Sequence, residues 1–233
     1  MLKKLIIAIL VTSPIFAKTF SLEALYGFGI VNIPIAQGKL DGNAQDGGIR
    51  AIFFTDNFTH EVLGRATFTS SVKTNGLTNL TSILTQMSTV IPGVKTNSLP
   101  SKYTTWEAEY RFGSRMDSDM AKLGMLAGSA YLGLGYQSLM TKINYIYMPF
   151  GFWGEDDAGV SGLKMRYGLN FKAMFFDVST GKFKWDFLLG GKVYAGVGYS
   201  LGNVVDIFGQ LFFTYNAPIK KLKIYGIEAG IQF

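Results

Sequence analysis

The chain has 233 residues, a net charge of +6 and a positive mean hydropathy of +0.22, and 15% of its residues are aromatic. It contains no cysteine, which excludes disulfide bonds, thiolate metal sites and a lipid anchor on an N-terminal cysteine. The basic residues are spread singly along the chain, so the modest positive charge does not indicate nucleic-acid binding.

The first residues have the three parts of a secretory signal peptide. Two lysines precede an apolar stretch at 5–11, and the small residue Ala17 ends the region. The stretch is too short for a transmembrane helix, which needs about 20 apolar residues. The alternative is a buried N-terminal strand or helix. We predict that residues 1–17 are a signal peptide and that residues 18–233 form one domain.

The rest of the chain is organised in segments that alternate between apolar and polar residues. In WEAEYRF (106–112) every second residue is apolar or aromatic, and the residues between are charged. Strict alternation is typical of a β-strand with two different faces, because successive side chains point to opposite sides of a sheet. The clear segments lie at 20–30, 47–54, 59–72, 106–112, 124–138, 163–175, 183–199, 204–215 and 222–233. They predict an all-β protein.

The last segment, LKIYGIEAGIQF, alternates up to the terminal Phe233. This ending resembles the C-terminal strand of bacterial outer-membrane β-barrels of the small OmpA/OmpX-like class. The resemblance implies a transmembrane antiparallel up-and-down β-barrel over residues 18–233, located in the bacterial outer membrane. It also implies that Tyr225, Ile231 and Phe233 form the signal that the barrel-assembly machinery reads. The apolar faces would then contact outer-membrane lipid and lipopolysaccharide, and the charged faces would line the lumen.

A soluble, lipocalin-like barrel is the alternative fold. It would turn the aromatic face of WEAEYRF inward and place the charged face in water. Alternation alone does not separate the two folds. We favour the membrane barrel because the last strand runs to Phe233 and because aromatic residues lie at both ends of the apolar faces, as in membrane girdles.

Nine clear segments conflict with the even strand number of bacterial single-chain barrels. We predict the missing strand at 141–153, where Pro149 must lie at a strand end or at an unpaired N–H position. Part of this segment, NYIYMPFGF, is similar to the returning strand of small outer-membrane proteins from ε-proteobacteria. The prediction is therefore about ten strands, with eight as the alternative.

Ten strands define which connections lie on each side of the membrane. The longest connection, 74–101, falls outside the cell, and its apolar residues recur at a spacing that predicts a short helix over the barrel mouth. The predicted periplasmic connections lie near Asn57 and at 113–123, 154–161 and 200–203. The predicted extracellular connections lie at 33–46, 74–101, 139–141, 177–182 and 217–221.

Charged residues on the face opposite the aromatic residues are predicted to line the lumen. Both signs are present, so they can neutralise one another across strands. A barrel of about eight strands is just filled by side chains, whereas open pores need roughly 16 strands or more. The predicted lumen network consists of Glu23, Arg50, Glu61, Arg65, Glu107, Glu109, Arg111, Lys164, Arg166, Lys172, Lys184, Asp186, Lys192 and Glu228.

We predict no catalytic residue, no metal site and no cofactor. Outer-membrane lipid hydrolases and proteases use a histidine base, but His60 shares a face with apolar residues and lies next to a periplasmic turn. The acidic run at 155–157 lacks the spacing of a calcium loop and is interpreted as a solvated turn. Glycine-rich stretches lack the strand–turn–helix context of a nucleotide site.

Three functions follow from this reading. The favoured one is a structural or surface-interaction scaffold whose extracellular loops could bind a ligand that the sequence does not identify. The alternative is a narrow channel for ions or small solutes. A lipid-modifying enzyme is the least favoured.

Overall fold

The computed structural model describes residues 20–35, 38–75, 102–117, 124–139, 143–202, 204–216 and 222–233. The predicted signal peptide and nearly all of the predicted 74–101 loop lie outside these residues. The described residues form ten strands: β1 (Phe20–Ile35), β2 (Gly38–Phe54), β3 (Phe58–Asn75), β4 (Lys102–Arg115), β5 (Met125–Leu139), β6 (Ile143–Asp157), β7 (Leu163–Asp177), β8 (Lys182–Leu201), β9 (Val205–Asn216) and β10 (Leu222–Gln232).

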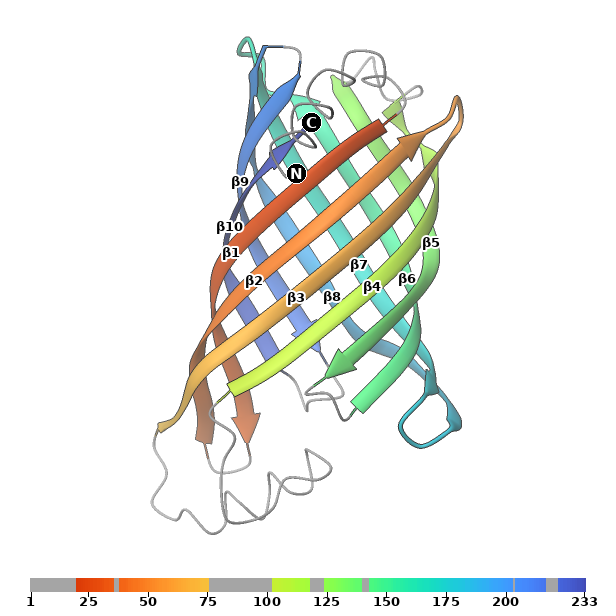
Figure 1. Cartoon of the computed structure of the whole chain (residues 1–233). Coiled ribbons are helices and arrows are strands. Elements are labelled where there is room, and N and C mark those ends of the chain that lie inside the picture. The colour runs from red at the N-terminus through yellow and green to blue at the C-terminus, as the bar shows by residue number, and fades with distance from the viewer. Residues whose placement is uncertain are drawn as a thin grey trace, which may run out of the picture.

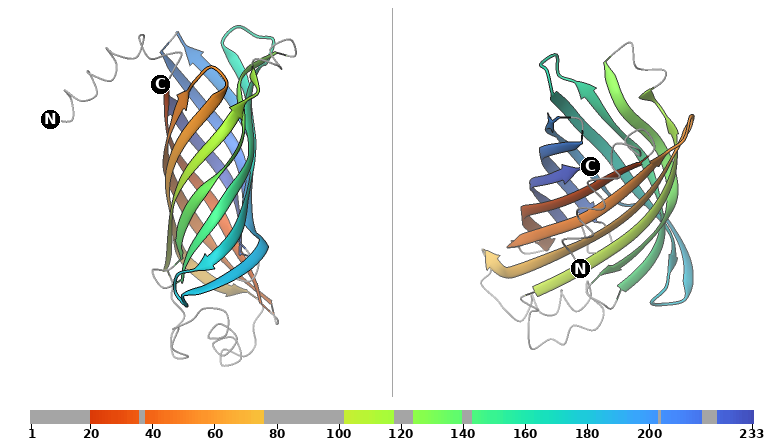
Figure 2. Two further views of the ribbon diagram at one scale, coloured as in Figure 1. Left: turned by 90° about the vertical axis from the view of Figure 1, so that its right-hand side faces the viewer. Right: turned by 45° about the horizontal axis from the view of Figure 1, so that its top comes forward.

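The ten strands close into one antiparallel barrel (Figure 1). Each strand pairs with its neighbours in the sequence, and β10 pairs with β1 to close the sheet. Figure 2 shows from two further directions that the strands are strongly tilted. The up-and-down barrel and its ten strands are thus confirmed, and the eight-stranded alternative is wrong.

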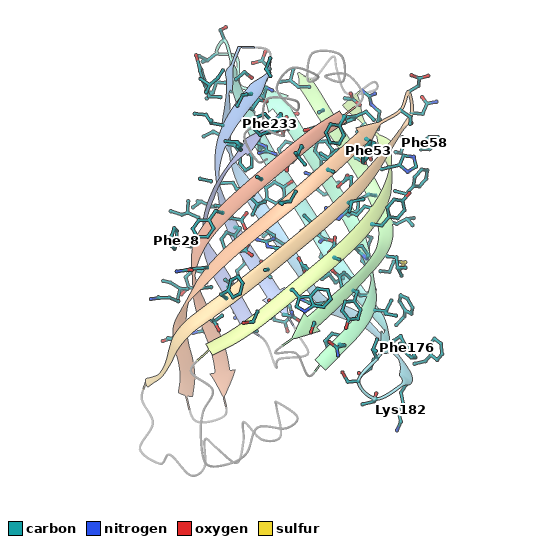
Figure 3. All side chains as sticks on the ribbon, in the orientation of Figure 1. Phe28, Phe53, Phe58, Phe176, Lys182 and Phe233 are labelled. Atoms are coloured by element: carbon teal, nitrogen blue, oxygen red, sulfur yellow. The ribbon has the colours of Figure 1, made fainter. Side chains whose placement is uncertain are left out.

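The outside of the barrel is apolar and its inside is polar. Phe28, Phe53 and Phe58 lie on the outer surface, where Phe28 is 60% exposed (Figure 3). Within β4, Tyr110 points outward and is 47% exposed, whereas Arg111 is only 7% exposed. A soluble barrel would bury the aromatic face, so the lipocalin-like alternative is wrong. An apolar exterior around a closed sheet is the arrangement that lipid requires, because no strand edge is left without hydrogen bonds.

The predicted tenth strand is β6, and Pro149 lies in its middle rather than at its end. Pro149 is fully buried on the lumen side. The ladder between β5 and β6 pairs Leu132 with Phe150 and Gly135 with Tyr147, and no pairs join the residues between them. Pro149 therefore sits at a gap in the ladder, where its missing N–H leaves no bond unmade.

Two predicted connections contain more strand than expected. Residues 38–46 belong to β2 and pair with β1 and β3, although 33–46 was predicted as a loop. Likewise β6 continues to Asp157, although 154–161 was predicted as a turn. The run DGNAQDGG lacks apolar alternation, which is why its sequence resembles a loop. Strands pair through backbone N–H and C=O groups, so neighbouring strands can hold this segment in the sheet although its side chains do not alternate.

Inward-pointing rings lie over glycines of the adjacent strand. A Cβ atom on Gly135 would lie 2.4 Å from the ring of Tyr147, and one on Gly168 would lie 2.5 Å from the ring of Tyr194. Only glycine allows these rings to lie flat against the wall. The rings then occupy lumen space that would otherwise be open.

The two ends of the barrel differ. The turns after β2, β6 and β8 lie at the end where the C-terminus lies (Figure 1). In a bacterial outer-membrane barrel this is the periplasmic end, and β1, β3, β5, β7 and β9 run toward the extracellular end.

Candidate functional site

The lumen is crossed by a continuous series of ion pairs, which we call the ion-pair chain. Positive and negative groups alternate along its whole length, and it links residues of six strands. In order of contact its members are Glu155, Arg166, Glu23, Arg50, Glu61, Arg111, Glu109, Lys172 and Glu107. The chain thus joins opposite walls of the barrel through side chains.

Glu61 lies at the centre of the ion-pair chain and is fully buried. Its carboxylate accepts hydrogen bonds from Arg50 Nε at 3.0 Å and from Trp153 Nε1 at 2.6 Å. Arg111 Nη1 lies 3.5 Å from the same carboxylate. Buried charges are tolerated when they are paired and hydrogen-bonded, and Glu61 meets both conditions.

A second cluster lies beside the ion-pair chain. Glu228 from β10 accepts hydrogen bonds from Lys192 Nζ at 2.6 Å and from Gln210 Nε2 at 2.8 Å. Arg65 bridges Glu228 to Asp46. The cluster ties β2, β3, β8, β9 and β10 together, so both lumen networks join strands that are far apart in the sequence.

An apolar layer lies in the periplasmic half of the lumen. It consists of Ile52, Tyr131 and Trp153, with Phe54, Ala127 and Tyr194 packed against them. The ion-pair chain rests on this layer, because the Arg50 guanidinium lies 4.4 Å from the Trp153 ring and that of Arg111 lies 4.5 Å from the Tyr131 ring. Stacking of a cation on an aromatic face adds to the ion pairs.

Above this layer the lumen contains a cavity of about 90 Å³. Trp153 and Tyr131 line its floor, and Asn216 and Leu222, from strand ends on the extracellular side, line its upper part. On this measure a cavity needs about 10–15 Å³ to hold one water, so it has room for several.

Twelve of the predicted lumen residues have described side chains, and all of them point inward. Eight belong to the ion-pair chain and three to the second cluster, whereas Lys164 pairs with Asp206 near the periplasmic end. The side chains of Lys184 and Asp186 lie outside the described part of the structure. The prediction missed Asp46, Glu155 and Asp206 as lumen residues. The alternation of side chains along a strand could have identified Asp46. It is an even number of residues from Arg50, and such residues lie on the same face of a strand.

The predicted assembly residues lie along the closing seam. Tyr225 and Ile231 point outward. The backbone of Phe233 exchanges two hydrogen bonds with Leu22 of β1, at 2.9 and 3.1 Å. The last residue therefore takes part in closing the barrel, whatever the assembly machinery recognises.

His60 lies outside the lumen, near the periplasmic turn. Its Nδ1 is 2.8 Å from the hydroxyl of Tyr110, and its ring packs against Phe112. Neither neighbour is the serine, acidic residue or asparagine that would complete a catalytic site built on a histidine base. Within the described ranges, no group of three histidine or acidic side chains could hold a metal ion.

Similarity to known proteins is found at the level of structure. No family model matches the sequence, and no curated protein matches it. The translocator domain of the autotransporter NalP from Neisseria meningitidis is similar in structure, with a TM-score of 0.45 and 9% identity over 99% of this chain and 95% of that chain. The β domain of the Bordetella autotransporter BrkA has a TM-score of 0.46 and 10% identity over 92% of this chain and 99% of that chain.

A third solved structure gives a similar result. Ail, the attachment invasion locus protein of Yersinia pestis, has a TM-score of 0.37 and 11% identity over 93% of this chain and 99% of that chain. None of these similarities carries a function over to this chain. The closed sheet, the apolar exterior and the charged lumen identify the protein as an outer-membrane β-barrel.

Proposed function

We propose that the protein is a non-conducting scaffold that holds its extracellular connections at the cell surface. The observation that carries this proposal is the filled lumen, in which the apolar layer and the ion-pair chain lie across the path of a solute. Outer-membrane lipid and lipopolysaccharide would surround the apolar exterior. The barrel-assembly machinery would recognise the final strand.

The energetics of the lumen support a closed barrel. Removing one partner of a buried ion pair costs about 3–5 kcal/mol, because the other charge is left without compensation. A conducting path through the ion-pair chain would have to move several paired charges apart at once, so the paired arrangement favours a closed barrel.

Planar-bilayer recording tests the proposal. We expect no conductance steps from the wild-type barrel, because ions cannot pass the layer formed by Ile52, Tyr131 and Trp153. Trp153→Ala removes the largest ring from that layer and should produce small steps, whereas Trp106→Ala, on the outer surface, should produce none. Steady conductance by the wild-type barrel would contradict the scaffold and favour the narrow channel.

We also propose that the protein is not a lipid-modifying enzyme. His60→Ala should leave any phospholipid hydrolysis by the purified barrel unchanged, because the imidazole faces outward beside Tyr110 and away from the outer leaflet. Release of fatty acid from labelled phospholipid vesicles measures this. Hydrolysis by the wild type that is lost in His60→Ala would overturn the proposal.

A further inference from the structure

The outer wall of the barrel presents a row of three apolar or aromatic residues near its extracellular end. Strand pairing places Phe213 of β9, Tyr225 of β10 and Ile30 of β1 side by side. Their side chains are 38%, 46% and 47% exposed, so they belong to the surface that contacts lipid. Aromatic rings gather where the hydrocarbon core meets the lipid headgroups, so the boundary of the outer leaflet lies at this row on these three strands.

The next row toward the extracellular end is polar, and we call it the boundary row. It contains Tyr215 of β9, Lys223 of β10, Asn32 of β1, Asp41 of β2 and Lys73 of β3, each directly opposite the next. Lys223 is exposed, and Asn32 Nδ2 donates a hydrogen bond to Asp41 at 2.7 Å. The row thus brings residues from five strands to the level of the lipid headgroups.

The outer face carries lysine at the extracellular end and not at the periplasmic end. In the boundary row Lys73 and Lys223 outnumber Asp41, and the strand that carries Asn32 separates Asp41 from Lys223. At the periplasmic end, the outer face of the described strands carries the carboxylate of Asp156 and neither lysine nor arginine. Because opposite charges attract, the extracellular boundary favours an anionic headgroup.

We propose that the boundary row binds a phosphate group of lipopolysaccharide, with the ammonium group of Lys223 as its anchor. This inference rests on the proposed function, which surrounds the scaffold with outer-membrane lipid, and it specifies where that lipid is held. The ammonium group has three N–H donors on a flexible apolar stem, which can lie along the wall while the charge reaches the headgroup. The hydroxyl of Tyr215, directly opposite on β9, is the second donor. The apolar row below contacts the acyl chains of the same lipid.

Titration of the refolded barrel in detergent micelles with fluorescently labelled lipopolysaccharide tests the proposal. The wild type should bind saturably, and it should bind lipopolysaccharide stripped of its lipid A phosphates more weakly. Lys223→Gln should weaken binding of the phosphorylated lipid about fivefold, the factor expected when one lysine is removed near an anionic membrane surface. It should leave binding of the stripped lipid unchanged. Lys223→Arg keeps the charge and should bind nearly as well as the wild type.

Lys182→Gln is the matched control. It removes the same charge from an exposed lysine at the tip of the β7–β8 hairpin, on a strand outside the boundary row (Figure 3). This variant should bind the phosphorylated lipid like the wild type. Heat-dependent gel migration confirms that each variant is folded.

Any of four results would overturn the proposal. The first is no saturable binding of lipopolysaccharide by the wild type, and the second is equal affinity for the intact and the stripped lipid. The third is equal weakening by Lys182→Gln and Lys223→Gln, which would mean that binding follows net charge. The fourth is displacement of the lipid by an equal concentration of inorganic phosphate, which would mean an anion site without lipid. None of these results depends on conductance, so the inference and the proposed scaffold function can fail separately.

Discussion

Glu61→Ala should lower the free energy of unfolding by about 3–5 kcal/mol, the range expected when one partner of a buried ion pair is removed. Glu61 is fully buried and lies at the centre of the ion-pair chain. Its loss would leave Arg50 with Glu23 alone, at 3.5 Å, and would leave Trp153 Nε1 without its acceptor. Arg50 would then be only partly compensated, and the indole N–H of Trp153 would be unpaired, in a poorly hydrated interior.

Urea unfolding of the refolded barrel in lipid vesicles, followed by tryptophan fluorescence, measures this effect. Glu61→Gln should be less damaging, because the amide oxygen can still accept the hydrogen bond from Trp153. Lys182→Ala, at the exposed tip of the β7–β8 hairpin (Figure 3), is the control and should change stability by no more than about 0.5 kcal/mol. If Glu61→Ala were equally mild, the lumen would be hydrated, as in an open pore.

Deletion of Phe233 should sharply reduce the amount of folded barrel in the outer membrane of living cells. In refolding experiments the same deletion should lower the free energy of unfolding by only about 1–3 kcal/mol, the net value of two backbone hydrogen bonds. Those two bonds join Phe233 to Leu22 at the seam between β10 and β1. A large effect in cells with a small effect on stability would separate recognition of the terminal residue from its structural role.

Heat-dependent migration of membrane fractions on SDS gels measures assembly in cells. Phe233→Tyr keeps an aromatic C-terminus and both seam hydrogen bonds, so it should assemble nearly as well as the wild type. Normal assembly of the truncated chain would contradict the role assigned to Phe233. Equal losses in cells and in refolding would mean that the seam alone explains the defect.

The amino-acid sequence by itself determined which side of each strand faces lipid. Successive side chains of a strand point in opposite directions, so alternation placed Tyr110 and Arg111 on opposite faces. The final strand ending in Phe233 and the aromatic girdles then assigned Tyr110 to the exterior before any tertiary contact was known. An even strand number and the alternating final segment then led to ten strands and to β6. These features are local, or follow from a rule of topology, and do not depend on how the strands are staggered.

Strand lengths could be predicted less well from the sequence, because pairing continues through segments whose side chains do not alternate. Residues 38–46 carry a loop-like composition, yet β1 and β3 hold them in the sheet. Asp46 was missed in the lumen for this reason, and Glu155 was missed because the acidic run at 155–157 resembles a turn. Backbone partners on the neighbouring strands decide whether such a segment is a strand, and the segment's own sequence does not show them.

Only the tertiary structure decided which lumen charges meet. Glu61 and Trp153 are 92 positions apart, and Arg166 and Glu23 are 143 apart. The stagger of strands around a closed barrel sets which inward side chains lie at one level, and no local pattern encodes that stagger. The cavity arises in the same way, as the space that remains once side chains from all ten strands have filled the interior.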